Sequence, residues 1–224
     1  MKVGILHAME TEPDPFSSFF RSVSAPFECQ AFEITKGEYP DSSGVYDAFI
    51  VSGSKKGVYD PDRWIADLSE FIRNCHLEQR KLIGICFGHQ LIAHALGGYA
   101  SKSDKGWGLG LREFDITTQK SWMDPALDQC ALYFSHQDQV TALPAEAELI
   151  GGSEFCPNAI YCIGDQVLGI QGHPEISRSL MVQIIERRKE QVGSKVYIDA
   201  LDSLNNRIPD ARTVARWIIN FINL

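Results

Sequence analysis

The sequence predicts an α/β fold in which helices cover both faces of a mainly parallel β-sheet. Short apolar segments alternate with helical patterns through the first half of the chain, and this alternation is typical of βαβ units. The segment KLIGICFGHQ, residues 81–90, has the pattern of a buried strand that turns sharply into a helix. The length of 224 residues and the hydrophobic content of 44% favour one large domain with a substantial core.

The first half is expected to contain three strands before the sharp turn, over Lys2–His7, Phe27–Ile34 and Ala48–Gly53. A helix over Pro13–Ser22 separates the first two. The next helix is indicated by apolar residues that recur at the helical period. These residues are Trp64, Ile65, Leu68, Phe71, Ile72 and Cys75. Either Asp60 or Asp62 is expected to cap its start.

The rest of the chain is expected to become richer in β-strands and then helical. A strand over Leu82–Cys86 leads into a helix over Gly88–Leu96, which Gly97-Gly98 ends. Further strands are expected over Leu109–Thr117, Ala131–Phe134 and Glu148–Ile150, followed by a hairpin of Ala159–Ile163 and Gln166–Ile170 that turns at Gly164-Asp165. Near the end, a predicted helix has an apolar face that should dock on the body. Its members are Val214, Trp217, Ile218, Phe221 and Ile222.

Cys86 occupies the apex of the strand-to-helix turn, in the pattern Gly84-Ile85-Cys86-Phe87-Gly88. The same pattern with serine is the nucleophile elbow of hydrolases. Small neighbours relieve crowding at such a junction, and the start of a helix favours thiolate over thiol. A buried core cysteine is the alternative for this residue taken alone.

A second motif supplies what a cysteine nucleophile requires. The segment VLGIQGHPE, residues 167–175, is a short apolar strand followed by His173 and Glu175. A nucleophilic thiol needs a base to take its proton, and the base needs a carboxylate to orient it. We therefore predict that Cys86, His173 and Glu175 form a catalytic triad.

Together, GICFGHQ and QGHPE resemble the motif pair of the class I glutamine amidotransferases, whose triad is Cys–His–Glu. The segments AFIVSGS (residues 48–54), HQLIAHALGG and SHQDQV (residues 135–140) are also similar. The similarity covers about residues 3–175 and is strongest to the amidotransferase domain of GMP synthase and to plant γ-glutamyl peptidases. It implies a flavodoxin-like three-layer sandwich, with a single domain over 1–224 and a helical extension over 176–224.

The resemblance also implies roles for further residues. Backbone N–H groups of Ser54 and Phe87 would form the oxyanion hole, with Gly53 beside the substrate. Substrate recognition would fall to Gln90, Ser135, Gln137 and Asp138. Two positions depart from the usual pattern, because Ser54 and Gln137 stand where glycine is common. Both departures are shared by the γ-glutamyl peptidase-like members.

Three functions fit these residues. The first is a glutaminase that forms a γ-glutamyl thioester and releases ammonia for a separate synthetase. The second is a stand-alone hydrolase of γ-glutamyl peptides, and the third is a binding module that kept the fold without activity. The chain contains no Ser-Gly-Gly-x-Asp-Ser pyrophosphatase loop, so an ammonia acceptor would have to be activated by another chain.

Composition restricts the partners further. The formal net charge of −8 argues against nucleic acid or an anionic membrane as the main partner. No apolar run approaches the roughly 18 residues of a membrane span, and the first residues have the pattern of a strand, not of a signal peptide. We therefore expect a cytoplasmic protein. The six cysteines show no CxxC spacing, so free thiols are expected, with neither a metal nor an organic cofactor.

Overall fold

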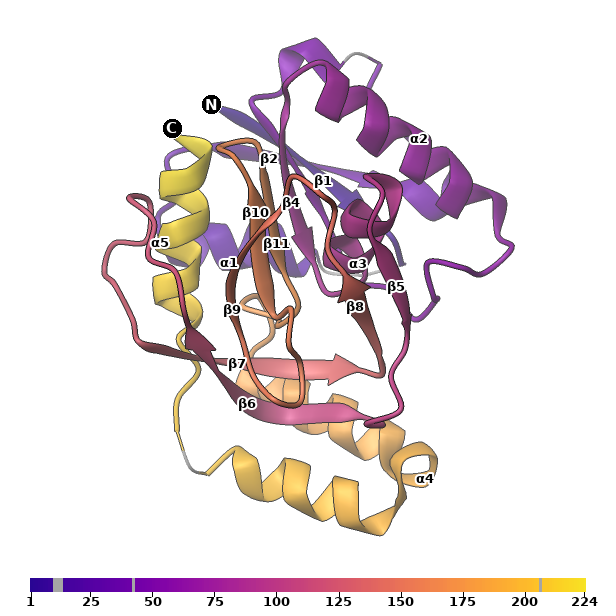
Figure 1. Cartoon of the computed structure of the whole chain (residues 1–224), viewed down its shortest axis with the longest axis vertical. Helices are drawn as coiled ribbons and strands as arrows, with labels where there is room; N and C mark the ends of the chain where they lie inside the picture. The colour runs from indigo at the N-terminus through magenta and orange to yellow at the C-terminus, as the bar shows by residue number, and fades with distance from the viewer. Residues whose placement is uncertain (10–13, 42, 206) are drawn as a thin grey trace.

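The computed structural model describes residues 1–9, 14–41, 43–205 and 207–224. Within these ranges, nine strands form one sheet in the order β2-β1-β3-β4-β11-β10-β9-β6-β7 (Figure 1). Helices lie on both sides of this sheet, so the predicted α/β fold is confirmed. Pro13, the first residue of the first expected helix, lies outside the described residues.

One half of the sheet is parallel. It consists of β2 (Glu28–Glu33), β1 (Lys2–His7), β3 (Ala48–Val51), β4 (Lys81–Ile85) and β11 (Val167–Ile170). Every residue of β3 and β11 is buried, as expected for central strands of a parallel sheet covered on both faces. The predicted bounds of β1 are confirmed. The carboxyl ends of β3, β4 and β11 therefore meet at one edge of the sheet.

The other half is antiparallel and contains the predicted hairpin. In order across the sheet it consists of β10 (Ile160–Ile163), β9 (Glu148–Gly152), β6 (Gly108–Ile116) and β7 (Gln129–His136). Gly164 has φ +49° at the turn between β10 and β11, a conformation that glycine adopts without steric cost.

Two helices cover each face of the parallel half (Figure 1). The apolar residues of α1 (Pro15–Ser22) and α5 (Ala211–Ile222) belong to one buried cluster. Those of α2 (Arg63–Leu77) and α3 (Phe87–Ala95) belong to a second cluster. In α2 the residue before the helix is Asp62, but its side chain makes no capping hydrogen bond.

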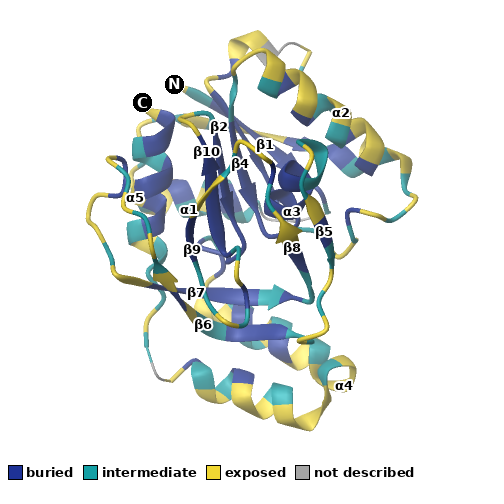
Figure 2. Ribbon diagram, viewed as in Figure 1, coloured by how far each residue is buried: buried dark blue, intermediate teal, exposed yellow. Residues whose placement is uncertain are grey.

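The apolar face predicted for the last helix is confirmed, because all five of its members are buried (Figure 2). Trp217 is fully buried, and its indole N–H donates to the carbonyl of Pro125 at 2.8 Å. Its ring meets that of Trp122 edge-on, with 6.4 Å between the ring centroids. Within the described ranges, no helix combines the length and apolar character needed to cross a bilayer.

Two strands and one α-helix were not predicted individually. β5 (Tyr99–Lys102) and β8 (Asp138–Ala142) pair in a separate antiparallel sheet of two strands. The long helix α4 (Arg178–Ser203) is kinked at Gly193, where φ is 78° and ψ is 161°. Residues of α4 form a third buried cluster with β6 and β7, and this places α4 beside the antiparallel half of the sheet (Figure 1).

Candidate active site

Cys86 lies between β4 and α3, at the edge where the parallel strands end. Its backbone has φ 54° and ψ −105°, a conformation that non-glycine residues rarely adopt. The flanking glycines are required by close approach. A Cβ at Gly84 would lie 2.5 Å from the backbone of Gly88, and a Cβ at Gly88 would lie 2.2 Å from the carbonyl oxygen of Val51. The expected elbow geometry is therefore present.

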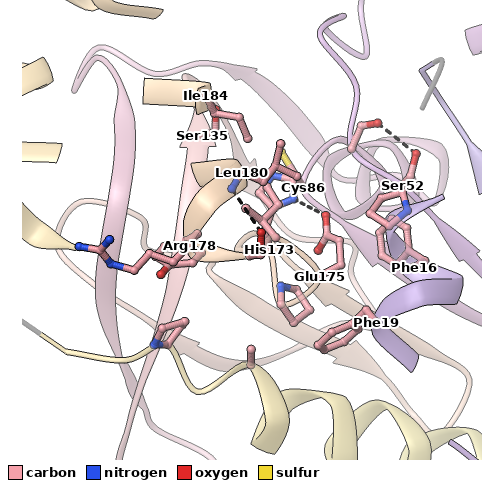
Figure 3. Close-up of a pocket in the computed structure, with 18 of the residues that line it drawn as sticks. Phe16, Phe19, Ser52, Cys86, Ser135, His173, Glu175, Arg178, Leu180 and Ile184 are labelled. Atoms are coloured by element: carbon pink, nitrogen blue, oxygen red, sulfur yellow. Dashed lines mark hydrogen bonds and ion pairs between the residues drawn. The ribbon is translucent and has the colours of Figure 1, made fainter. Parts of the chain in front are cut away.

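His173 and Glu175 follow β11 and lie beside this elbow (Figure 3). The His173 N–H donates to the Tyr133 carbonyl at 2.8 Å, so that β7 holds its backbone. The Nδ1 of its ring lies 2.7 Å from Glu175 Oε1, and the two side chains are only 9% and 5% exposed. With Nδ1–H donating to the carboxylate, Nε2 is left for Cys86, whose thiolate raises the pKa of His173.

Electrostatics favour a charged imidazole at this position. Burial alone would lower the pKa of His173, but the Glu175 carboxylate and the Cys86 thiolate more than offset it. The pKa of His173 is therefore raised well above its ordinary value. An imidazolium beside a thiolate is the charge state of an activated cysteine nucleophile.

The loop after β3 closes the site on a second side. A Cβ at Gly53 would lie 3.0 Å from Cε1 of His173 and 3.6 Å from Cβ of Cys86, so Gly53 packs directly against both side chains. Ser54 follows Gly53 in the lining of the same cavity. Phe87 is the first residue of α3, and its N–H therefore has no acceptor within the helix.

The three predicted triad residues open into a cavity of about 1290 Å³ (Figure 3). Gly53, Ser54 and Ser135 also line it. Its apolar walls come from two helices: Phe16 and Phe19 on α1, and Leu180 and Ile184 on α4. In Figure 3, Ser135 and Ile184 lie on one side of Cys86, whereas Phe16 and Phe19 lie on the other.

The described lining of this cavity does not include Gln90, Gln137 or Asp138. Gln90 is 3% exposed, and its side-chain N–H₂ donates to the Asp138 carbonyl at 2.7 Å and to Oε1 of Gln171 at 3.0 Å. The carbonyl of Gln137 accepts from the N–H of Ser103. Burial raises the pKa of the Asp138 carboxyl, although its hydrogen bond with Tyr59 acts in the opposite direction. These hydrogen bonds connect the start of β8 to α3 and to the residue that follows β5.

Arg188 on α4 is a candidate residue that the sequence analysis did not identify. Its Nε donates to Oγ of Ser135 at 3.0 Å, and its guanidinium lies over the ring of Trp107, 4.3 Å from the centroid. Leu180, Ile184 and Arg188 all line the cavity and follow one another at four-residue intervals on one helix face. An arginine that continues an apolar stripe is the sequence signal that marks this position.

Other reactive groups lie elsewhere. The remaining five cysteines are free, and burial raises the pKa of each of them. His89 and His136 are buried, and burial lowers the pKa of both to about 3, so both are neutral at physiological pH. Across the described residues, no group of three or more His, Cys, Asp or Glu side chains is arranged to hold a metal ion.

Comparison with known proteins agrees with this geometry. Residues 20–190 match the family described as glutamine amidotransferase class-I. The chain is 34% identical to γ-glutamyl peptidase 3 of Arabidopsis thaliana over 166 residues. This alignment covers 70% of this chain and 66% of that protein. Over 146 residues it is 36% identical to the glutamine-hydrolysing GMP synthase of Porphyromonas gingivalis, covering 62% of this chain and 26% of that protein.

The fold also matches a solved structure. A glutamine amidotransferase from Thermotoga maritima superimposes with a TM-score of 0.82 over 99% of both chains, at 18% sequence identity. The two proteins therefore share the flavodoxin-like arrangement of a sheet between helices. Given the match over residues 20–190, the chain belongs to the class I glutamine amidotransferase family.

Proposed function

We propose that this protein hydrolyses γ-glutamyl amides through a thioester on Cys86. The observation that carries the proposal is the convergence of Cys86, His173 and Glu175 in a single cavity, with His173 Nδ1 2.7 Å from Glu175. A base between a thiol and an orienting carboxylate is the arrangement required for nucleophilic catalysis. Two relatives are named γ-glutamyl peptidase and glutamine-hydrolysing GMP synthase, and both names describe the hydrolysis of a γ-glutamyl amide.

The reaction has two steps. The Cys86 thiolate attacks the side-chain carbonyl carbon of the γ-glutamyl group, and the developing oxyanion accepts hydrogen bonds from the backbone N–H groups of Phe87 and Ser54. The His173 imidazolium gives its proton to the departing nitrogen, the C–N bond breaks, and the amine leaves. Water then attacks the thioester as His173 takes its proton, the C–S bond breaks, and glutamate is released. Glu175 holds the imidazole in the required tautomer.

The cavity favours an amine larger than ammonia as the leaving group. Its volume of about 1290 Å³ exceeds the roughly 300–1,000 Å³ typical of small-molecule sites. Phe16 and Phe19 extend its apolar wall beyond Glu175 (Figure 3). A γ-glutamyl peptide uses this space, whereas glutamine leaves most of it empty. In this proposal the helices over 176–224 belong to the same domain as the triad, because α4 supplies one wall.

A second candidate function is the release of ammonia from glutamine for a separate synthetase chain. It is favoured by the similarity to the P. gingivalis GMP synthase, of which this chain covers only a quarter. In that case, hydrolysis of glutamine by the isolated protein should be slow until the synthetase binds and orders the site.

The test is to give the purified protein, without a partner, glutamine and a series of γ-glutamyl dipeptides, and to measure glutamate release. We expect brisk cleavage of the dipeptides, slow cleavage of glutamine, and loss of both in Cys86→Ala. Cys29→Ala is the matched control, because this half-buried thiol lies outside the cavity. Slow glutamine cleavage that a synthetase accelerates, without dipeptide cleavage, would select the second candidate. Activity that survives in Cys86→Ala would refute both.

A further inference from the structure

The helix α1 supplies an apolar wall of the cavity that contains Cys86. Phe16 and Phe19 on α1 line the cavity, and Val23, the residue that follows the helix, continues this lining. The three residues are spaced at i, i+3 and i+7, so their side chains share one face of the helix. In Figure 3, Phe16 and Phe19 lie on the same side of Cys86 as Glu175. These three residues are called the α1 wall below.

Phe19 is not needed to anchor α1 to the core. Phe20 performs that task, because it is only 2% exposed and its ring packs on the ring of Phe27, with 5.1 Å between the centroids. Phe19 contacts the Phe20 ring at 5.3 Å between centroids but remains half-buried, and it lines the cavity. An aromatic ring that is left half-covered beside a reactive thiol is available to bind an apolar group.

The start of α1 is fixed at the edge of the sheet where the parallel strands end. The Asp14 carboxylate caps the helix by accepting from the N–H groups of Phe16 at 2.9 Å and Ser17 at 3.2 Å. The same carboxylate lies 3.1 Å from Nε2 of His7, the last residue of β1. Burial alone would raise the pKa of Asp14, but the hydrogen bonds from His7 and Ser17 lower it to about 2. The α1 wall is therefore held in place before any ligand binds.

The register of the sheet gives the distance between this wall and the thiol. Leu6 of β1 is aligned with Val51 of β3, which is aligned with Gly84 of β4. Neighbouring strands are about 4.8 Å apart, so the end of β1 lies about 10 Å from the elbow. This separation leaves room for a side chain of several atoms between a leaving nitrogen at Cys86 and the α1 wall. A methyl group does not fill it.

The charges of the substrate decide which part of it faces the α1 wall. A γ-glutamyl group ends in an ammonium and a carboxylate, and burying either against an apolar surface is costly. The leaving amine has to face His173, which must protonate it, and His173 lies beside Glu175 on the way to Phe16 and Phe19 (Figure 3). The side chain of the leaving amine is therefore the part that suits the α1 wall.

We propose that the α1 wall is a subsite for the side chain of the leaving amine, and that it selects γ-glutamyl amides of amines with large apolar side chains. This inference rests on the proposed function. A hydrophobic pocket discriminates between apolar groups of different size by about 10- to 200-fold. We expect kcat/KM for γ-glutamylphenylalanine to exceed that for γ-glutamylalanine by about 10- to 100-fold.

The test compares Phe19→Ala with Phe71→Ala. Phe71 is also a half-buried phenylalanine on a helix, but it packs on Tyr39 and Phe49 in the second buried cluster. Phe19→Ala should lower kcat/KM for γ-glutamylphenylalanine about tenfold and for γ-glutamylalanine less than about twofold. Phe71→Ala should leave the ratio of the two unchanged. An unchanged ratio in Phe19→Ala, or an equal fall of the ratio in Phe71→Ala, would overturn the assignment.

A gain of selectivity excludes a loss caused by poor folding. Phe19→Lys places a cation in the wall, and a cation attracts a leaving amine with an anionic side chain. The preference should then change from γ-glutamylphenylalanine to γ-glutamylglutamate. A Phe19→Lys protein that still prefers γ-glutamylphenylalanine would contradict the subsite.

Binding separates this inference from the proposed function. In a Cys86→Ala background, calorimetry measures the affinity for both dipeptides without turnover. Tighter binding of γ-glutamylphenylalanine that Phe19→Ala abolishes would support the subsite, and if the wild-type protein were then inactive, only the proposed function would fail. Cleavage of both dipeptides at equal rates would refute the subsite and leave the proposed function standing. No measurable binding of γ-glutamylphenylalanine would also refute the subsite.

Discussion

Replacing Gly53 by alanine tests the proposed site, because the distance between the added Cβ and the His173 ring follows from the structure. The added Cβ would lie 3.0 Å from Cε1 of His173, whereas ordinary contacts begin at 3.4 Å, so the imidazole would have to move by 0.4 Å. The ring resists this movement, because Glu175 holds it at 2.7 Å and Tyr133 holds its backbone at 2.8 Å. A displacement of 1 Å costs catalysis about 100-fold. Scaled in proportion to this displacement, the activation free energy rises enough for kcat/KM to fall about sixfold.

The fold should tolerate this change, at a cost of about 1–2 kcal/mol of unfolding free energy from overpacking. Glutamate release gives kcat/KM, an NMR spectrum of the His173 ring reports its displacement, and urea denaturation gives the stability. Gly4→Ala is the matched control. Its Cβ would meet the Phe49 ring at 2.6 Å in the core, so it should lower stability while leaving turnover unchanged. A Gly53→Ala protein with normal turnover and an unshifted His173 signal would refute the geometry.

Cys86 should react with a glutamine-analogue diazo-ketone far faster than the other five thiols, since burial raises the pKa of each of those; mass spectrometry showing label spread evenly would contradict this. Glu175→Gln should lower the pKa of His173, because it removes a carboxylate that raises it. Activity that needs the imidazolium would then be lost at a lower pH than in the wild type, and an NMR titration in which the pKa is unchanged would exclude the pairing. Trp217→Ala should cost about 3–5 kcal/mol of unfolding free energy, and an unchanged urea midpoint would show that its packing is not stabilising.

Apolar patterning was sufficient to predict the parallel half of the sheet. Strands such as β3 and β11 are buried on both faces, so each appears in the sequence as an uninterrupted apolar run. The pairing of β5 with β8 could not be predicted in this way. Both strands are short and contain polar residues, and the register joins Lys102 to Asp138 across a distant part of the chain. The non-helical backbone at Gly193 likewise interrupts the helical period within α4, which weakens any single periodic pattern.

The candidate site could be predicted where residues close in the sequence determine the local backbone conformation or lie next to each other in space. The glycines around Cys86 mark a turn that leaves no room for side chains, and His173 and Glu175 are close in sequence. Gln90 and Asp138 illustrate the limit. They contact each other through a hydrogen bond from a side chain to a carbonyl, and sequence cannot distinguish a polar group that contacts its neighbours from one that contacts a ligand. The position of Arg188 in an apolar stripe can be read from the sequence, but its contact with Ser135 depends on the placement of α4 beside β7.

The strand β7 fixes the spacing of two residues beside the candidate site. Tyr133, which holds the base, and Ser135, which holds Arg188, are two residues apart on it, a spacing of about 6.5–7 Å fixed by the pleat. Pairing with Leu111 and Leu109 of β6 keeps both residues in register. A substitution in β6 or β7 that shifts this register would therefore displace the His173 backbone and the Arg188 side chain together.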